Sequence, residues 1–206
     1  MNKAGILFLL QIVQTIFNVG LFTLITLLFY KIKDKTLKGM WKKAGVCKPK
    51  KGDFLRSFKI ISIAYLFTIM IFIIFKIVNG GISVELLSNE RETCSVFAII
   101  LMILMVGFRS GFGEELLFRG AIGKTLIKKF GIIKGNILQS LIFTLPHILT
   151  FVKLPGLESI CLLMNAFVIG LAFGYITYKE DGCIIPVMVW HGIINMIAIP
   201  IAWFIL

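Results

Sequence analysis

The chain has 206 residues, of which 58% are hydrophobic, and its mean hydropathy is +0.97. Ordinary soluble domains are about 45–50% apolar, so the composition excludes a soluble function. The net charge of +12 is uneven, because eleven of the 22 Lys and Arg residues lie in segment 31–59, opposed only by Asp34 and Asp53. The sequence therefore predicts a membrane protein that forms a single domain over residues 1–206.

Segment 31–59 follows the positive-inside rule, by which Lys and Arg gather in cytoplasmic loops. We therefore expect this basic segment to be a cytoplasmic loop of a multi-pass protein in the cell membrane. Its charge is compatible with holding anionic lipid. Binding of nucleic acid by such a run is the weaker alternative, so the predicted partners include the lipid bilayer and no nucleic acid.

Apolar runs of roughly 20 residues are long enough to cross a bilayer as helices. They predict an all-α polytopic bundle of about six transmembrane helices. In chain order these are 5–30, 60–78, one that begins at 96, 134–152, 159–178 and 183–206. Residues 1–95 hold the first two helices and the basic loop, and residues 96–206 hold the other four. The charges of the loops place both termini outside.

Small residues and one proline predict how some of these helices pack. Gly107 and Gly111 are four residues apart, and so are Gly170 and Gly174. Such spacing lets a second helix approach closely, although the glycines near 107 could equally mark a break between two helical pieces. Pro146 predicts a kink.

The cysteines show no metal-binding or disulfide pattern. They are scattered along the chain, at Cys47, Cys94, Cys161 and Cys183, and no two of them form a CxxC pair. Cys47 lies in the basic loop, which we expect to face a reducing cytosol. The sequence therefore predicts neither a disulfide framework nor a zinc knuckle.

Five ionisable residues lie inside apolar runs. Glu114, Glu115 and Arg119 fall within six residues, and His147 and His191 are the only histidines of the chain. One charged side chain at the bilayer centre costs roughly 2.5–3.5 kcal/mol on insertion scales. Three charges in so short a stretch need a compensating structure or a function, so we expect these groups to form one buried polar site.

Three of these residues share a predicted depth. Glu114, His147 and His191 each lie ten to thirteen residues from a charged residue at the cytoplasmic end of their own helix. At about 1.5 Å per residue, all three lie roughly 15–20 Å into the membrane. The sequence therefore predicts that the site is in the cytoplasmic half of the bilayer.

The residue types suit hydrolysis of an amide. A carboxylate and an imidazole can deprotonate a water molecule, and a second imidazole with a carboxamide can stabilise the oxyanion that forms. His191 and Asn195 are four residues apart, so they project from one face of a helix, and Glu115 and Arg119 can pair in the same way. Two carboxylates and two histidines could instead hold zinc, with Glu114 as one ligand.

Three motifs stand in a fixed order on separate apolar segments. They are Glu114-Glu115-x-x-x-Arg119, Phe143-x-x-x-His147 and His191-x-x-x-Asn195. In this order they resemble the CPBP family of intramembrane endopeptidases, which is the type II CAAX prenyl protease and bacteriocin-processing (Abi) family. The resemblance covers about residues 107–197, nearly half of the chain.

The resemblance implies roles for the matching residues. Glu114 and His147 would activate water, and His191 and Asn195 would form the oxyanion hole. If a metal were present, its ligands would be Glu114, His147 and His191.

The remaining motif residues would support the site. Glu115 and Arg119 would orient the water-activating group and hold the helices together, and a purely structural buried ion pair is the alternative for them. Phe143 would be a packing residue that lines the site.

We therefore expect a bacterial intramembrane peptidase that cleaves a peptide or small membrane protein without a cofactor. A zinc-dependent form of the same protease is one alternative. A second is a non-catalytic protein for bacteriocin self-immunity or scaffolding, in which the site residues are structural. A third is a small transporter, since intramembrane charges also mark ion paths.

Overall fold

A computed structural model describes residues 3–79, 96–152 and 156–204. Every element in these ranges is a helix, and they contain no strand, which confirms the all-α prediction. Residues 80–95, which include Cys94, and residues 153–155 lie outside the described residues.

The helices include π and 3-10 segments as well as α-helices. In chain order they are α1 (Lys3–Asp34), α2 (Met40–Lys43), α3 (Asp53–Asn79), α5 (Val96–Phe108), the π-helices η1 (Arg109–Glu114) and η2 (Leu116–Gly123), α6 (Lys124–Thr144), the 3-10 helix η3 (Leu145–Val152), α7 (Gly156–Lys179) and α8 (Ile185–Phe204). They form two compact units. Unit 1 comprises Met1–Leu37, Ser83–Leu117 and Met188–Leu206, and unit 2 comprises Lys38–Ile82 and Phe118–Val187. The units interleave along the chain, so the predicted single domain, divided at residue 95, stays a prediction.

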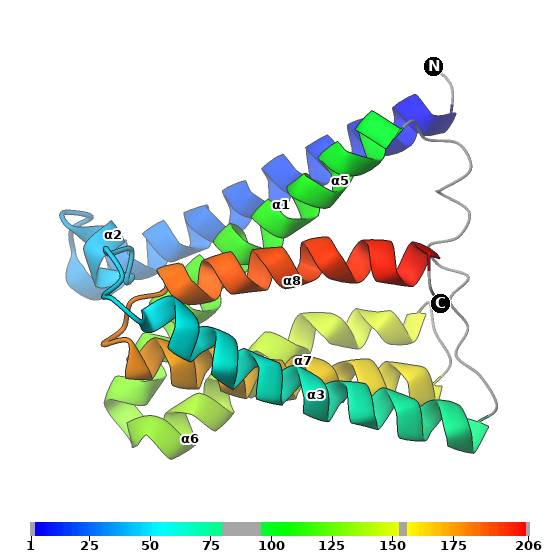
Figure 1. Ribbon diagram of the computed structural model, residues 1–206. Coiled ribbons are helices and arrows are strands. Elements are labelled where there is room, and N and C mark those ends of the chain that lie inside the picture. Colours follow the sequence, from blue (N-terminus) through cyan, green and yellow to red (C-terminus); the bar gives the residue numbers. More distant parts are fainter. Residues whose placement is uncertain (1–2, 80–95, 153–155, 205–206) are drawn as a thin grey trace. The chain divides into compact units, whose positions relative to one another are not determined.

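In unit 1, α5 and η1 pack along α1, and Figure 1 shows α1 and α5 side by side. The contact is close at Gly113, where a Cβ atom would lie 3.2 Å from the ring of Phe22. The part of α8 that begins at Met188 belongs to the same unit. Unit 1 therefore holds Glu114 and Glu115 of the acidic motif in one packed body with the motif of His191 and Asn195.

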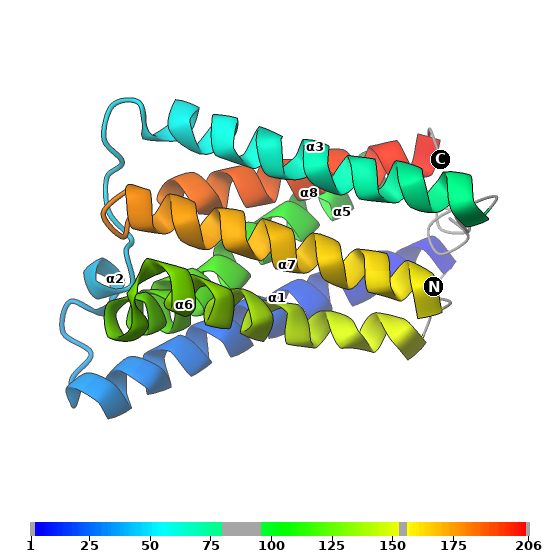
Figure 2. The same cartoon turned by 90° about the horizontal axis from the view of Figure 1, so that it is seen from below.

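In unit 2, α7 lies between α3 and α6, as Figure 2 shows. Helix α7 contacts α6 at Gly170 and Gly174. A Cβ atom at Gly170 would lie 3.2 Å from Ser140, and one at Gly174 would overlap the amide of Asn136. The buried Gln139 side chain donates to the carbonyl of Gly170 at 2.8 Å. The predicted close approach at this glycine pair is confirmed, with polar side chains filling the space.

Four helical stretches within the described ranges are long and apolar enough to cross a membrane. They are Phe8–Asp34, Asp53–Phe75, Val96–Leu149 and Gly156–Lys179, and Ile185–Ile197 is a shorter apolar helix. The third has 54 residues, more than twice the roughly 20 that one crossing needs. Gly131 interrupts it, with φ 77° and ψ 170° inside α6. The chain is thus a multi-pass membrane protein, and the count of six crossings stays a prediction.

The basic segment is more helical than predicted. Lys31–Asp34 continue α1, and α3 already begins at Asp53 rather than at residue 60. The turn before α3 uses Gly52 at φ 91°, and the Asp53 carboxylate accepts a hydrogen bond from the backbone N–H of Lys50 at 2.7 Å. Hydropathy alone places a helix end where apolar residues stop, whereas these local hydrogen bonds start the helix seven residues earlier.

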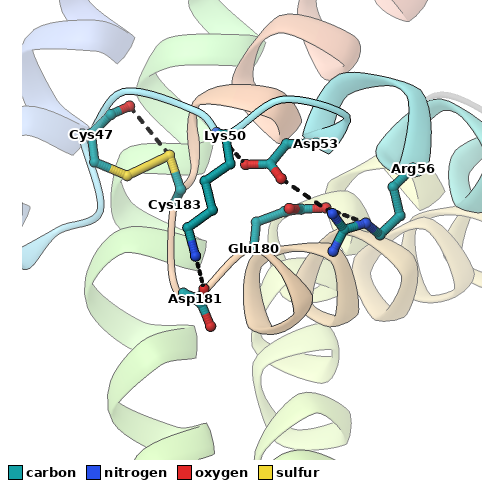
Figure 3. A network of polar contacts seen from close by, with 7 residues as sticks. All are labelled: Cys47, Lys50, Asp53, Arg56, Glu180, Asp181 and Cys183. Atoms are coloured by element: carbon teal, nitrogen blue, oxygen red, sulfur yellow. Dashed lines mark hydrogen bonds and ion pairs between the residues drawn. A yellow bond between two sulfur atoms is a disulfide. The ribbon is translucent and has the colours of Figure 1, made fainter.

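A polar cluster of unit 2 joins the start of α3 to the end of α7 (Figure 3). Arg56 lies 3.3 Å from the Asp53 carboxylate and 3.6 Å from that of Glu180. Lys50 pairs with Asp181, and the pKa of Lys50 is raised by this hydrogen bond and by the negative charge of Asp181. Lys50 and Asp181 are 131 positions apart in sequence, so the cluster ties two turns that are distant along the chain.

The prediction of no disulfide is wrong for one pair. Cys47 and Cys183 form a disulfide beside this cluster, and their Cα atoms are 5.7 Å apart (Figure 3). The two residues are separated by 136 positions, so no local spacing could reveal them. The backbone brings them together, because the N–H of Ile184 donates to the carbonyl of Gly45 at 2.9 Å.

Candidate active site

The acidic motif lies in a π-helical stretch. Glu114 is the last residue of η1, Glu115 follows it, and η2 begins at Leu116. The hydrogen bonds here follow the wider i→i+5 pattern of a π-helix, and the predicted pairing of Glu115 with Arg119 stays a prediction. Such π segments occur frequently at functional sites.

A crossing of small residues brings α8 against this stretch. A Cβ atom at Gly192 would lie 2.9 Å from the carbonyl oxygen of Gly107, and one at Gly111 would overlap the carbonyl of Met188. Only glycine leaves room for backbones at this distance. The predicted close approach at Gly107 and Gly111 is therefore confirmed, and it sets His191, the neighbour of Gly192, beside the acidic motif.

The crossing pairs Glu115 with His191. Nδ1 of the imidazole lies 2.7 Å from Oε1 of the carboxylate. Glu115 is 0% exposed and His191 is 6% exposed, so water does not screen the pair. An ionised carboxylate can only accept a hydrogen bond, so Nδ1 carries the proton and Nε2 is the nitrogen on the opposite edge of the ring.

The sequence did not predict this pairing. It assigned Glu115 to Arg119 and grouped His191 with Asn195. The available signal was the glycine spacing, because Gly111 lies four residues before Glu115 and Gly192 follows His191 directly. A close crossing at these glycines implies that the residues beside it meet.

Glu114 and Asn195 also belong to unit 1. Both side chains are half-buried. Asn195 follows His191 by one turn of α8, so the two share a helix face as predicted. The catalytic role assigned to Glu114 stays a prediction.

Arg119 is held in unit 2 by aromatic rings. Its side chain is 0% exposed, and its guanidinium carbon lies 4.1 Å from the ring centre of Phe143 and 5.1 Å from that of Phe173. A cation over aromatic faces is stabilised by the negative charge of the ring faces. Phe118 adds an edge-to-face contact with Phe143 at 5.1 Å. Phe143 is therefore a buried packing residue, and its place beside a substrate stays a prediction.

His147 lies on η3, where the α-helical pattern stops at Thr144 just before Pro146. Its Nδ1 is 3.2 Å from the carbonyl oxygen of Phe143. A carbonyl can only accept, so Nδ1 donates and Nε2 is the nitrogen without a proton in neutral His147. That tautomer is the one a general base needs at Nε2.

The sequence left a zinc site open as an alternative. In the part of the chain that the structure describes, no three His, Cys, Asp or Glu side chains gather as a metal site. The expectation of no cofactor, with Glu114, His147 and His191 as the ligands if a metal were present, stays a prediction, and we derive no step through zinc.

Residues 95–197 match the family model described as type II CAAX prenyl endopeptidase Rce1-like. The chain belongs to this family. The matched segment contains all three motifs and begins one residue before α5, which confirms the resemblance stated from the motifs. Comparison with curated proteins and with solved structures found no match. This family is a family of membrane proteases, and the motif residues of the chain lie on the helices described above.

Proposed function

We propose that the protein is an intramembrane endopeptidase that hydrolyses a peptide bond without a bound metal ion. Its substrate is a peptide or a small membrane protein. The observation that carries the proposal is the buried 2.7 Å pair of Glu115 and His191, which lies within the segment matched to a protease family.

Water activation is assigned to Glu114 and His147. His147 suits this role because the Phe143 carbonyl holds its Nδ1 proton, which leaves Nε2 to accept a proton from water. The hydroxide formed attacks the carbonyl carbon of the scissile bond. General bases of this kind contribute roughly 10²–10⁴-fold to rate.

Stabilisation of the oxyanion is assigned to His191 and Asn195. The oxyanion would meet the edge of the His191 ring opposite Nδ1, and Glu115 holds the ring in that orientation through its 2.7 Å contact with Nδ1. The Asn195 amide supplies a second donor. When the intermediate collapses, the C–N bond breaks and the leaving amine takes a proton from the site.

Glu115 and Arg119 are positioning residues in this scheme. Glu115 fixes the ring of His191, and Arg119 fixes η2 through its contacts with Phe143 and Phe173. We further propose that the protein resides in a bacterial cell membrane with residues 31–59 at the cytoplasmic side, which puts cleavage in the cytoplasmic half of the bilayer.

The test is a cleavage assay on the purified full-length protein in lipid nanodiscs, with a library of quenched fluorescent peptides as substrates. We expect Glu114→Ala to lower cleavage by roughly 10²-fold or more. Glu158→Ala is the matched control, because Glu158 is a half-buried glutamate at the start of α7 outside the motifs. Full cleavage by the Glu114 variant would overturn its proposed role.

The same preparation tests the metal-free mechanism. We expect substoichiometric zinc by elemental analysis and unchanged cleavage in 1,10-phenanthroline. One bound zinc per chain, with loss of cleavage on chelation and recovery on adding zinc, would instead establish the zinc-dependent form.

A further inference from the structure

The disulfide between Cys47 and Cys183 lies where two turns of unit 2 are already held together. The carbonyl of Gly45 accepts from the N–H of Ile184 at 2.9 Å, and a Cβ atom at Gly45 would overlap the carbonyl of Gly182. Lys124 also donates to the Gly182 carbonyl at 3.1 Å. These contacts need no covalent bond, so the two cysteines stay adjacent whether or not their sulfur atoms are joined.

The backbone geometry accommodates both redox states. A Cα separation of 5.7 Å is within the range of about 4.4–6.8 Å that disulfides span. Sγ of Cys183 also lies 3.2 Å from the carbonyl oxygen of Cys47. In the reduced state the Cys183 thiol can donate to this carbonyl, so that buried thiol has a partner without the disulfide.

The two sulfur atoms differ in access. Cys47 is exposed, whereas Cys183 is 3% exposed. Lys48 follows Cys47 directly, and both Lys48 and Lys50 are exposed. Nearby positive charge favours the thiolate, which is the reactive form of cysteine. An oxidant in solution therefore meets Cys47 first, and Cys183 is placed to react with the product.

We propose that Cys47 and Cys183 are a reversible thiol–disulfide site that cross-links the loop before α3 to the turn before α8 when the protein meets a peroxide. The Cys47 thiolate attacks hydrogen peroxide, which gives a sulfenic acid and, after taking up a proton, one water. The Cys183 thiol then attacks the sulfenic sulfur, so the S–S bond forms, the S–O bond breaks and a second water leaves. The two sulfur atoms supply the two electrons that reduce the peroxide.

Reduction reverses the cross-link by thiol–disulfide exchange, in which a thiolate such as that of glutathione attacks one sulfur and forms a mixed disulfide. A second thiolate completes the release. The ion pair of Lys50 with Asp181 holds the same two turns, and Arg56 lies 3.6 Å from the carboxyl group of Glu180. The reduced turns therefore stay in register for the next oxidation.

The test uses full-length protein carrying Cys94→Ser and Cys161→Ser, so that only the proposed pair remains. After reduction and removal of the reductant, we expect maleimide to label two thiols per chain in aliquots that are denatured for labelling. Stoichiometric hydrogen peroxide should abolish this labelling and produce a peptide in which Cys47 and Cys183 are linked. Dithiothreitol under native conditions should restore both thiols.

A matched control carries Cys47→Ser in the same background. Peroxide should then leave Cys183 labelled, because the buried thiol has lost its reactive neighbour. A thermal midpoint of unfolding that rises on oxidation, falls on reduction and is constant in the control would show that the link constrains the fold. Persistence of both thiols in peroxide, oxidation of Cys47 without a linked peptide, or a link that dithiothreitol cannot open in the folded protein would overturn the proposal.

Discussion

Replacing Glu115 by alanine should destabilise the protein through His191. Nδ1 of His191 loses its acceptor at a place where neither side chain meets water, since Glu115 is 0% and His191 6% exposed. Removing one partner of a buried pair costs about 3–5 kcal/mol. In a chain of this size 1 kcal/mol shifts the unfolding midpoint by about 2–4 °C, so we expect a fall of roughly 6–20 °C.

A double-mutant cycle separates the pair from its surroundings. Glu115→Ala and His191→Ala should each destabilise, but the double variant should lose less than the sum, because both members of the contact are then absent. A hydrogen bond to a charged group contributes about 1.5–3 kcal/mol, and we expect a coupling free energy of that size. Glu115→Gln is the graded control, since its amide oxygen still accepts from Nδ1.

The assay is thermal unfolding in detergent. Circular dichroism monitors the transition, because it reports the helix content of the whole protein, whereas fluorescence would report the surroundings of a tryptophan. The order of midpoints should be wild type, Glu115→Gln, then Glu115→Ala. Additive effects in the double variant, within about 0.5 kcal/mol, would refute the inference that this contact holds α8 to the acidic motif.

Two further predictions concern a glycine and a buried acid. Gly111→Ala should lower the unfolding midpoint, because its Cβ would overlap the carbonyl of Met188. The control Gly20→Ala in α1 should leave the midpoint equal or higher, because nothing lies within 4 Å of that position. Equal effects in the two variants would contradict the close crossing. Burial, together with the Asp53 carboxylate, raises the pKa of Glu180 from 4.5 to about 7. The folded state therefore holds this proton more tightly than the unfolded chain does. The free energy of unfolding should fall by up to about 3 kcal/mol as the pH rises from 4.5 to 7. Glu180→Gln should remove this fall, so its midpoint should exceed that of wild type most clearly at pH 8, and parallel pH profiles would refute the explanation.

The fold class could be predicted because its signal is local. Apolar runs and the excess of Lys and Arg in one segment indicate a multi-pass helical membrane protein without knowledge of any contact. The glycine pairs were also informative, since a missing side chain permits a close helix at that position whatever the partner is. Their partners, Gly192 and Met188 on α8 for Gly111, came only from the structure.

The contact of Glu115 with His191 could not be predicted from spacing within a helix. Spacing relates residues of one helix only, and the π-helical turns on both sides of Glu115 also depart from α-helical spacing. His191 is 76 residues away, so no periodicity links the two. The ring orientation of His147 was equally hidden, because it depends on the change to a 3-10 helix at Leu145.

By itself, the sequence determined that this is an all-helical membrane protein, and its ordered motifs indicated a family of proteases. These are properties of residue type, order and local spacing. Only the tertiary structure decided that Glu115 contacts His191 and that Cys47 meets Cys183. Such contacts join residues far apart in the chain, and they depend on which helix backbones approach closely, a choice that packing makes over the whole unit.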